Sequence, residues 1–231
     1  MKIGVYVAHD DDAILGVGGR IVQHIKSEDS VYIVIFTDGR HSHKAVLGII
    51  NRPTPSQLKT TRRQEMLSAC TVLGVPKNRI YFLNQIDGDG GTWKESAKLR
   101  KVVAKISDNE KPDIIYFHHA DAHPDHQAVN QLMTKIVKGP KKQVAALQFF
   151  IWTKDKAVGR LEVSQKNMPL IPLRAIRINI EKEKAIKRRA LYKMKSQVYK
   201  KPYSDWHKQS QPILDRKFIS YFLNGEELFV K

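Results

Sequence analysis

Two short clusters of acidic residues and histidines are the groups in this chain best suited to chemistry. The first is Ala8-His9-Asp10-Asp11-Asp12, and it follows the apolar run 3–7. The second is His123-Pro124-Asp125-His126, and it follows the apolar run 114–117. Imidazole and carboxylate groups are typical zinc ligands in hydrolases, where three protein ligands leave one position for water. Two such clusters, far apart in sequence and alike in position, therefore suggest one metal site built from both.

The two clusters together contain every part that metal-assisted hydrolysis needs. His9, one carboxylate of the first cluster and His126 can supply the ligands. Bound zinc lowers the pKa of water to about 7 and polarises a carbonyl group. A neighbouring carboxylate can act as the base, and His123 can stabilise the oxyanion or protonate the leaving group. Asp125 can orient an imidazole through a hydrogen bond.

Each cluster taken alone also has a purely structural interpretation. Residues 10–12 could cap a helix that begins near Ala13, and 123–126 could be a turn that leads into a helix with Asp125 as its N-cap. The conjunction of the two clusters favours the chemical interpretation.

Strands and helices alternate along the chain, which predicts an α/β fold with a mostly parallel sheet and helices on both faces. The predicted strands span 2–8, 31–36, 79–83, 114–118, 144–152 and 174–180, and the predicted helices span 14–27, 57–73, 92–108, 126–138 and 182–201. Thr92 and Glu95 fit a capping box at the start of their helix. In such folds ligands bind at the carboxyl edge of the sheet, where both clusters are expected.

Two segments have no clear secondary-structure pattern. Residues 39–55 leave the same sheet edge as both clusters and carry His41 and His43, so they are a candidate substrate wall. Either histidine could be a fourth ligand, although solvated loop histidines are commoner. Residues 155–172 follow the fifth strand. We expect one domain over 1–231, with a core over 1–150 and a C-terminal part over 151–231 that completes the fold and could contribute to the substrate pocket.

The chain is strongly basic, with 40 Lys and Arg against 23 Asp and Glu and a formal net charge of +17. Such a surface attracts anions, but it also keeps a protein in solution. The charge is densest over 182–201, where Ile186, Met194 and Val198 form an apolar stripe and the lysines are expected on the solvated side. The single Cys70 excludes a disulfide framework, and no apolar run is long enough to cross a bilayer. A cytoplasmic location is the expectation.

The motifs resemble those of the LmbE-like, or PIG-L, superfamily of zinc-dependent N-deacetylases. The family's first motif, His-Pro-Asp-Asp, corresponds to His9-Asp10-Asp11-Asp12, and its His-x-Asp-His motif corresponds to 123–126. Thr37-Asp38-Gly39 and Arg62-x-x-Glu65 lie between them at family-like spacing. The resemblance covers roughly the first 140 residues. Gly16-x-Gly18-Gly19 does not have the spacing of a dinucleotide fingerprint, and we interpret it as close packing of a helix on the sheet.

The resemblance implies a Rossmann-like fold and a role for individual residues. It implies that zinc, or another divalent transition metal, is bound by His9, Asp12 and His126. It implies further roles for four residues: Asp11 as general base, His123 as oxyanion stabiliser or proton donor, Asp125 as a supporting residue and Arg62 in the substrate pocket.

One residue departs from the family motif. Asp10 stands where the family has Pro, so either Asp10 or Asp11 could be the base. Asp12 is expected to keep its place as ligand, because it stays three residues after His9.

These observations predict a hydrolase that removes an acyl group, most simply acetyl, from the amide nitrogen of an amino sugar or glycoconjugate. The amino sugar comes from the resemblance, and hydrolysis at a metal comes from the residues. The substrate could be anionic, and a homo-oligomer is possible. One alternative is a different amide substrate, such as a thiol conjugate. The other is a basic Rossmann-like module that binds nucleic acid without catalysis, and it is less favoured because the aromatic residues among the lysines fit a packed helix better.

Overall fold

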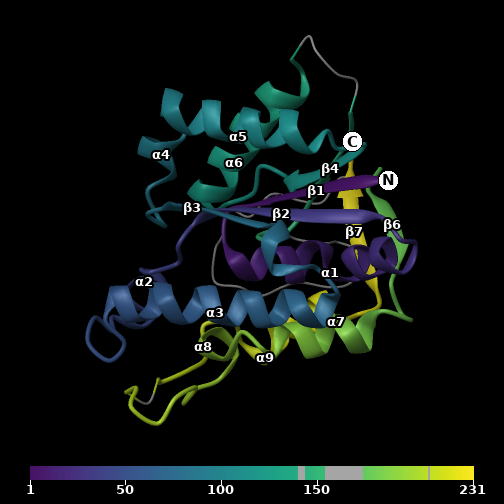
Figure 1. Ribbon diagram of the computed structural model, residues 1–231. Helices are drawn as coiled ribbons and strands as arrows, with labels where there is room; N and C mark the ends of the chain where they lie inside the picture. Colours follow the sequence, from purple (N-terminus) through teal and green to yellow (C-terminus); the bar gives the residue numbers. More distant parts are fainter. Residues whose placement is uncertain (140–143, 154–173, 208) are drawn as a thin grey trace.

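A single seven-stranded sheet forms the centre of the molecule (Figure 1). The computed structural model describes residues 1–139, 144–153, 174–207 and 209–231. The strand order is β3-β2-β1-β4-β5-β7-β6; β1 to β5 pair in parallel, and β7 runs antiparallel to both of its neighbours. The strands are β1 (Lys2–Val7), β2 (Ser30–Thr37), β3 (Ile80–Gln85), β4 (Ile114–His118), β5 (Ala145–Phe149), β6 (Ile176–Asn179) and β7 (Glu226–Val230). The predicted α/β class with a mostly parallel sheet is confirmed.

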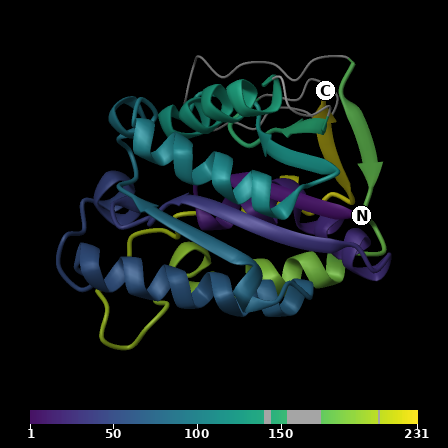
Figure 2. The same ribbon diagram turned by 45° about the horizontal axis from the view of Figure 1, so that its top comes forward.

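Helices cover both faces of the sheet (Figures 1 and 2). One face carries α1 (Asp10–Lys26), α3 (Pro55–Leu73), α7 (Lys184–Leu191), α8 (Lys195–Val198) and α9 (Arg216–Phe222). The other face carries α4 (Gly90–Trp93), α5 (Ala97–Glu110) and α6 (Pro124–Val137). The short helices α2 (Ser42–Leu47) and η1 (Lys77–Arg79) lie in the connections before and after α3.

The alternation of side chains along β1 explains the two layers. Ile3, Val5 and Val7 belong to the core beneath α1 and α3, whereas Tyr6 and Ala8 belong to the core beneath α5 and α6. All five are fully buried. Because successive strand residues point to opposite faces, a strand covered on both sides must be apolar throughout.

Glycines in α1 allow this helix to lie close against its neighbours. A Cβ atom at Gly19 would lie 2.6 Å from Cγ2 of Ile180, and one at Gly16 would overlap the ring of Phe149 in β5. The interpretation of the Gly16-x-Gly18-Gly19 run as a packing feature is therefore confirmed.

Two predicted helices are wrong in extent. The helix expected over 92–108 is divided into α4 and α5, and Ser96 caps α5 by accepting a hydrogen bond from the backbone N–H of Leu99. The capping box predicted at Thr92 is therefore not formed. The helix expected over 182–201 is likewise divided into α7 and α8.

One lysine of this second segment is not solvated as predicted. Lys187 is fully buried, and its Nζ donates to the carbonyl oxygen of Leu15 at 2.7 Å and to Glu227 Oε1 at 2.8 Å. Glu227 also accepts hydrogen bonds from the backbone N–H groups of Gly19 and Arg20 inside α1. A buried ion pair from α7 and β7 is thus bonded to the middle of α1.

The C-terminal elements α9 and β7 were not predicted from the sequence. The unpatterned segment 155–172 lies outside the described residues, whereas 39–55 contains the short helix α2. Within the described part of the chain, no helix has the length and apolar character needed to cross a lipid bilayer.

Candidate active site

The fold brings the two predicted clusters together at the carboxyl edge of adjacent parallel strands. His9 ends the connection from β1 to α1, and residues 10–12 form the first turn of that helix. His123 is the N-cap of α6, which follows β4, and His126 lies in its first turn. Since β1 pairs directly with β4, the two helix starts are neighbours. Asp125, assigned above as a possible cap, is instead the second residue of the helix.

Three side-chain atoms form a nearly equilateral triangle. His9 Nδ1 lies 3.1 Å from Asp12 Oδ2 and 3.3 Å from His126 Nε2. His126 Nε2 lies 3.2 Å from Asp12 Oδ2. A tetrahedral zinc ion with ligand bonds of about 2.0–2.1 Å needs ligand atoms about 3.3–3.4 Å apart. The donor set and its spacing therefore fit a small tetrahedral cation.

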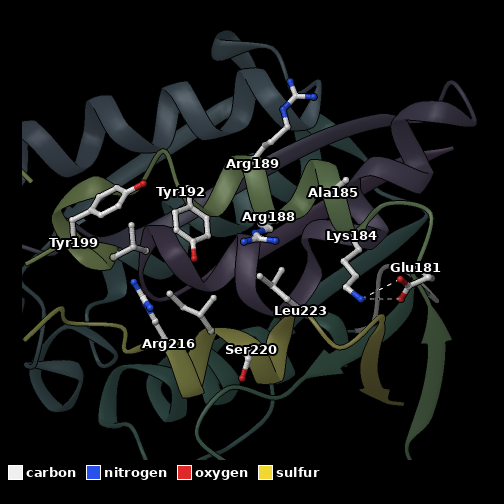
Figure 3. A pocket seen from close by; sticks show the side chains of 12 residues that line it. Glu181, Lys184, Ala185, Arg188, Arg189, Tyr192, Tyr199, Arg216, Ser220 and Leu223 are labelled. Carbon is white, nitrogen blue, oxygen red and sulfur yellow. Dashed lines mark hydrogen bonds and ion pairs between the residues drawn. The ribbon is translucent and has the colours of Figure 1, made fainter.

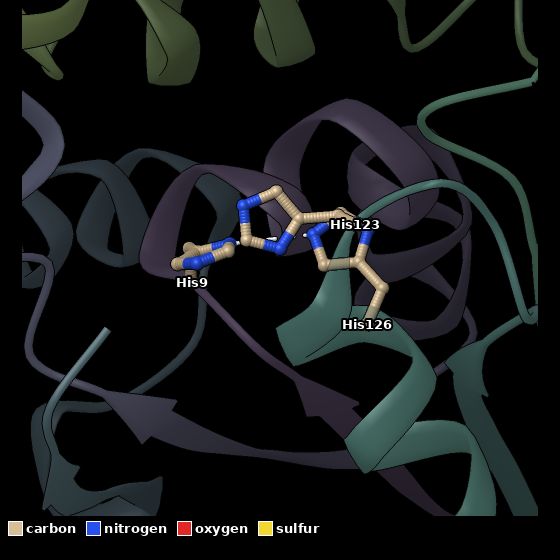
Figure 4. A group of neighbouring side chains, drawn as sticks. All are labelled: His9, His123 and His126. Atoms are coloured by element: carbon tan, nitrogen blue, oxygen red, sulfur yellow. Dashed lines mark hydrogen bonds between the residues drawn. The ribbon is translucent and has the colours of Figure 1, made fainter. Parts of the chain in front are cut away.

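Two more histidines lie beside this triangle. The rings of His9, His123 and His126 lie close together, with ring centroids 4.7–5.3 Å apart (Figure 4). His118, at the end of β4, is fully buried, and its Nε2 is 3.2 Å from Asp12 Oδ2. The ligand atoms of His9, His123 and His126, and those of Asp12, His118 and His126, also cluster closely enough to hold an ion.

Buried carboxylates hold the imidazoles of His9 and His126, the two histidines of the triangle, in place. Asp125 Oδ2 is 3.1 Å from His9 Nε2 and accepts a hydrogen bond from the backbone N–H of Gly88. Asp121 Oδ2 is 2.8 Å from His126 Nδ1. A carboxylate bonded to the remote nitrogen of a ligating histidine fixes its orientation and increases its basicity. Asp121 was missed from the sequence, although its place two residues before His123 was a usable signal.

The three consecutive aspartates of α1 have different surroundings. Asp10 points away from the cavity and accepts hydrogen bonds from Arg62, whose Nε lies 3.0 and 3.1 Å from the two carboxylate oxygens. Asp11 lines the cavity and lies 3.4 Å from Arg62 Nη2. Asp12 contacts the imidazoles of His9, His118 and His126. The helix turn thus separates the carboxylates, and only Asp11 is both open to the cavity and outside the triangle.

The ionisation of these groups follows from their neighbours. Burial opposes ionisation of Asp12, but the imidazoles of His126, His118 and His9 outweigh it and hold its pKa well below the usual range. Burial raises the pKa of Asp11 to about 6, although Arg62 acts in the opposite direction. Asp12 is therefore suited to bind a cation, and Asp11 is suited to exchange a proton near neutral pH.

His123 is held as a hydrogen-bond donor toward the cavity. Its Nδ1 accepts a hydrogen bond from the backbone N–H of Asp125 at 3.2 Å. Burial, together with His9 and His126, lowers the pKa of His123 to about 3, so the ring is neutral. A neutral imidazole with Nδ1 as acceptor carries its proton on Nε2.

The site opens into a cavity of about 500 Å³. The acidic and histidine side chains lie on one wall, and Arg62 contributes beside them. The segment 39–55 contributes His41, Ser42, Ala45 and Val46, so its predicted place at the wall of this cavity is confirmed. The sequence did not reveal the apolar wall, which comes from two distant segments and consists of Ile151, Trp152, Ile213, Leu214 and Phe218.

His43 does not belong to the triangle. It is 1% exposed, and its Nε2 donates to the side-chain amide oxygen of Gln209 at 2.6 Å. The expectation of a solvated loop histidine is therefore wrong for His43, which instead fastens α2 to the C-terminal part of the chain. Asp87 accepts a hydrogen bond from the backbone N–H of His41 and so connects its loop to the start of α2.

A Rossmann-like sheet with a triangle of two imidazoles and one carboxylate at its carboxyl edge defines the class of this molecule. The family model described as "PIG-L: GlcNAc-PI de-N-acetylase" matches residues 5–137. The chain therefore belongs to the PIG-L family of de-N-acetylases, as its motifs predicted. No curated protein matches the sequence.

Solved structures share the fold at low sequence identity. N,N'-diacetylchitobiose deacetylase from Pyrococcus horikoshii is 21% identical with a TM-score of 0.61, covering 84% of this chain and 69% of that one. GalB, the 4-carboxy-2-hydroxymuconate hydratase from Pseudomonas putida KT2440, is 18% identical with a TM-score of 0.68, covering 97% of this chain and 84% of that one. The zinc-inhibited form of teicoplanin deacetylase Orf2 is 14% identical with a TM-score of 0.62, covering 84% of each chain. The same fold thus carries more than one reaction.

Proposed function

We propose that this protein is a metal-dependent hydrolase that removes an acetyl group from the amide nitrogen of an N-acetylated amino sugar, such as an N-acetylglucosamine unit. The observation that carries the proposal is the triangle of His9, Asp12 and His126 beside a cavity that Asp11 also lines. Membership of the de-N-acetylase family supports the reaction type. Zinc fits the donor set, and N/O sites also accept other divalent transition metals.

His9, Asp12 and His126 would hold the ion, which supplies Lewis-acid polarisation of the amide carbonyl and a lowered pKa of water. Asp11 takes the proton of the attacking water, because among the three aspartates of α1 it is the one that lines the cavity without belonging to the triangle. His123 donates its Nε2–H to the oxyanion of the tetrahedral intermediate. The leaving amine then takes up from Asp11 the proton that this carboxylate received from the water.

Two further residues act by holding these groups. Arg62 lines the cavity, but its guanidinium is engaged by Asp10, so its main role is to fix the first turn of α1 and the direction of Asp11. Asp125 orients His9 through the 3.1 Å contact. Asp10, bound to Arg62 and turned from the cavity, is not the base.

The shape and lining of the cavity favour a sugar as substrate. A cavity of about 500 Å³ has room for one or two sugar rings. Trp152 lines the cavity, and the C–H face of a pyranose can pack against an aromatic ring. We propose that the part 151–231 completes the substrate pocket of a single domain. A thiol conjugate with a similar amide remains the alternative substrate, and a cytoplasmic location stays a prediction.

The test combines metal analysis with an amine-release assay. Purified protein is analysed for bound metals, then incubated with N,N'-diacetylchitobiose and with an N-acetylated thiol conjugate, and free amine is measured. We expect about one divalent ion per chain and amine release that His126→Ala abolishes. Metal-loaded protein that releases no amine from either substrate class would overturn the deacetylase assignment. A wild-type protein that takes up no divalent ion would overturn the metal site.

A further inference from the structure

A second large concavity lies outside the candidate active site. It is a groove of about 920 Å³ between α7 and α9, closed at one end by Val198 and Tyr199 (Figure 3). The helix α9 separates it from the catalytic cavity: Phe218 lines the cavity, and Ile219 lines the groove. None of the groove residues belongs to the proposed catalytic machinery.

Cationic side chains line this groove. Lys184 and Arg188 enter from α7 and Arg216 enters from α9, whereas Arg189 stands at the edge and points away from them (Figure 3). Glu181 is the single acidic residue of the lining, and it pairs with Lys184 at 3.1 Å. Among the residues that the structure describes, no carboxylate lies within 4.0 Å of Arg188 or Arg216. The groove therefore presents two guanidinium groups that form no ion pair with the described residues, and guanidinium groups are well suited to phosphate recognition.

The same groove has an aromatic and apolar side. Tyr199 is 42% exposed, and the ring of Tyr192 lies 6.0 Å from it at an interplanar angle of 60°. Ile219 in α9 and Leu223 just after it contribute apolar lining. Arg188 lies over the Tyr192 ring at 5.8 Å, so the cationic and aromatic parts are adjacent. A ligand that fills this groove needs anionic oxygens and a planar apolar group a short distance apart.

We propose that the groove between α7 and α9 binds a nucleoside phosphate, with the phosphates on Arg188 and Arg216 and the base against Tyr199. The volume of the groove is within the range of small-molecule and cofactor sites, about 300–1,000 Å³. A single-stranded nucleic acid is less well matched, because successive bases need successive stacking platforms and these two tyrosines are inclined to each other. The chemistry fits one nucleotide with its phosphates.

The test is titration calorimetry with ADP, inorganic pyrophosphate and a 20-nucleotide single strand. We expect ADP to bind at least about tenfold more tightly than pyrophosphate, since stacking of a base on an aromatic ring adds affinity. Arg188→Gln with Arg216→Gln should weaken ADP binding by about tenfold or more. Tyr199→Ala should reduce the preference for ADP over pyrophosphate and leave pyrophosphate binding unchanged.

A charge-matched control separates a site from general attraction. Lys101→Gln with Lys105→Gln removes the same charge from the exposed surface of α5, on the other face of the sheet. This control should bind ADP as the wild type does. Equal loss in both double variants, equal affinity for ADP and pyrophosphate, or tighter binding of the 20-nucleotide strand than of ADP would each overturn the proposal, as would no ADP binding at all. Circular dichroism of the variants verifies folding, and none of these readouts depends on deacetylase activity.

Discussion

The three consecutive aspartates of α1 provide the sharpest test of the candidate site. Asp10 is bonded to Arg62, Asp11 faces the cavity and Asp12 belongs to the triangle. Asn has nearly the same size and shape as Asp, so each substitution removes a charge and little else. We expect Asp10→Asn, Asp11→Asn and Asp12→Asn to fail in three different measurements.

Asp11→Asn should lower kcat and leave the bound metal in place. Loss of a general base typically costs about 10²–10⁴-fold. Asp12→Asn should instead release the metal, because the triangle, whose edges are 3.1–3.3 Å long, loses its one anionic group. Activity lost in this variant should return in part at high metal concentration.

Asp10→Asn should act on stability. Asp10 and Arg62 are 5% and 2% exposed, and breaking a buried ion pair by removing one partner costs about 3–5 kcal/mol. We expect the lower end, because the Asn oxygen still accepts a hydrogen bond and Asp11 lies 3.4 Å from Arg62. For a chain of this size, about 3 kcal/mol corresponds to a Tm lower by about 6–12 °C.

The assays are kcat on the deacetylase substrate and metal content per chain, both at a temperature where every variant is folded, and Tm by thermal denaturation. A largely inactive Asp10→Asn with normal Tm would refute the assignment of Asp11 as base. Metal loss in Asp11→Asn with metal retained in Asp12→Asn would refute the register of the site. Glu181→Gln, at an exposed ion pair far from the triangle, is the control and should change none of the three.

Three further results are expected. Asp121→Asn should weaken metal binding about 10–100-fold, because it removes the carboxylate partner of His126; metal titration with a competing chelator measures this, and unchanged affinity would contradict it. Lys187→Met should destabilise the fold by about 3–5 kcal/mol in urea unfolding by leaving Glu227 buried without its cation, whereas exposed Lys193→Met should not. Burial lowers the pKa of His43 from 6.5 to about 4, so between these values the unfolded chain binds the extra proton and stability falls as pH falls; His43→Gln should flatten this slope in unfolding measured from pH 7 to 4.

The local pattern of the chain determined the strands β1 to β6 of the sheet, but not β7. The apolar run of β1 and the alternation of strands with amphipathic helices depend on residues close in sequence, and the structure has these strands near the predicted positions. The same regularity placed both acid-histidine clusters at strand ends, and therefore at one edge. The approach of His9, Asp12 and His126 to one another could be anticipated, because His9 and Asp12 belong to the cluster after β1 and His126 belongs to the cluster after β4.

Only the tertiary structure decided which aspartate faces the cavity. Arg62 arrives from α3, 52 residues after Asp10, and turns that carboxylate away. The apolar wall at Phe218 and the carboxylate of Asp121 were likewise out of reach of local patterns, since their roles depend on side chains that meet only in the folded chain. Lys187 was expected to be solvated because it is a charged residue in a basic helical segment. Its burial depends instead on Glu227, 40 residues further along the chain, and on the space left at Gly18. Periodicity in the local sequence determines strands and helices, whereas contacts between side chains of distant elements are determined by how those elements pack.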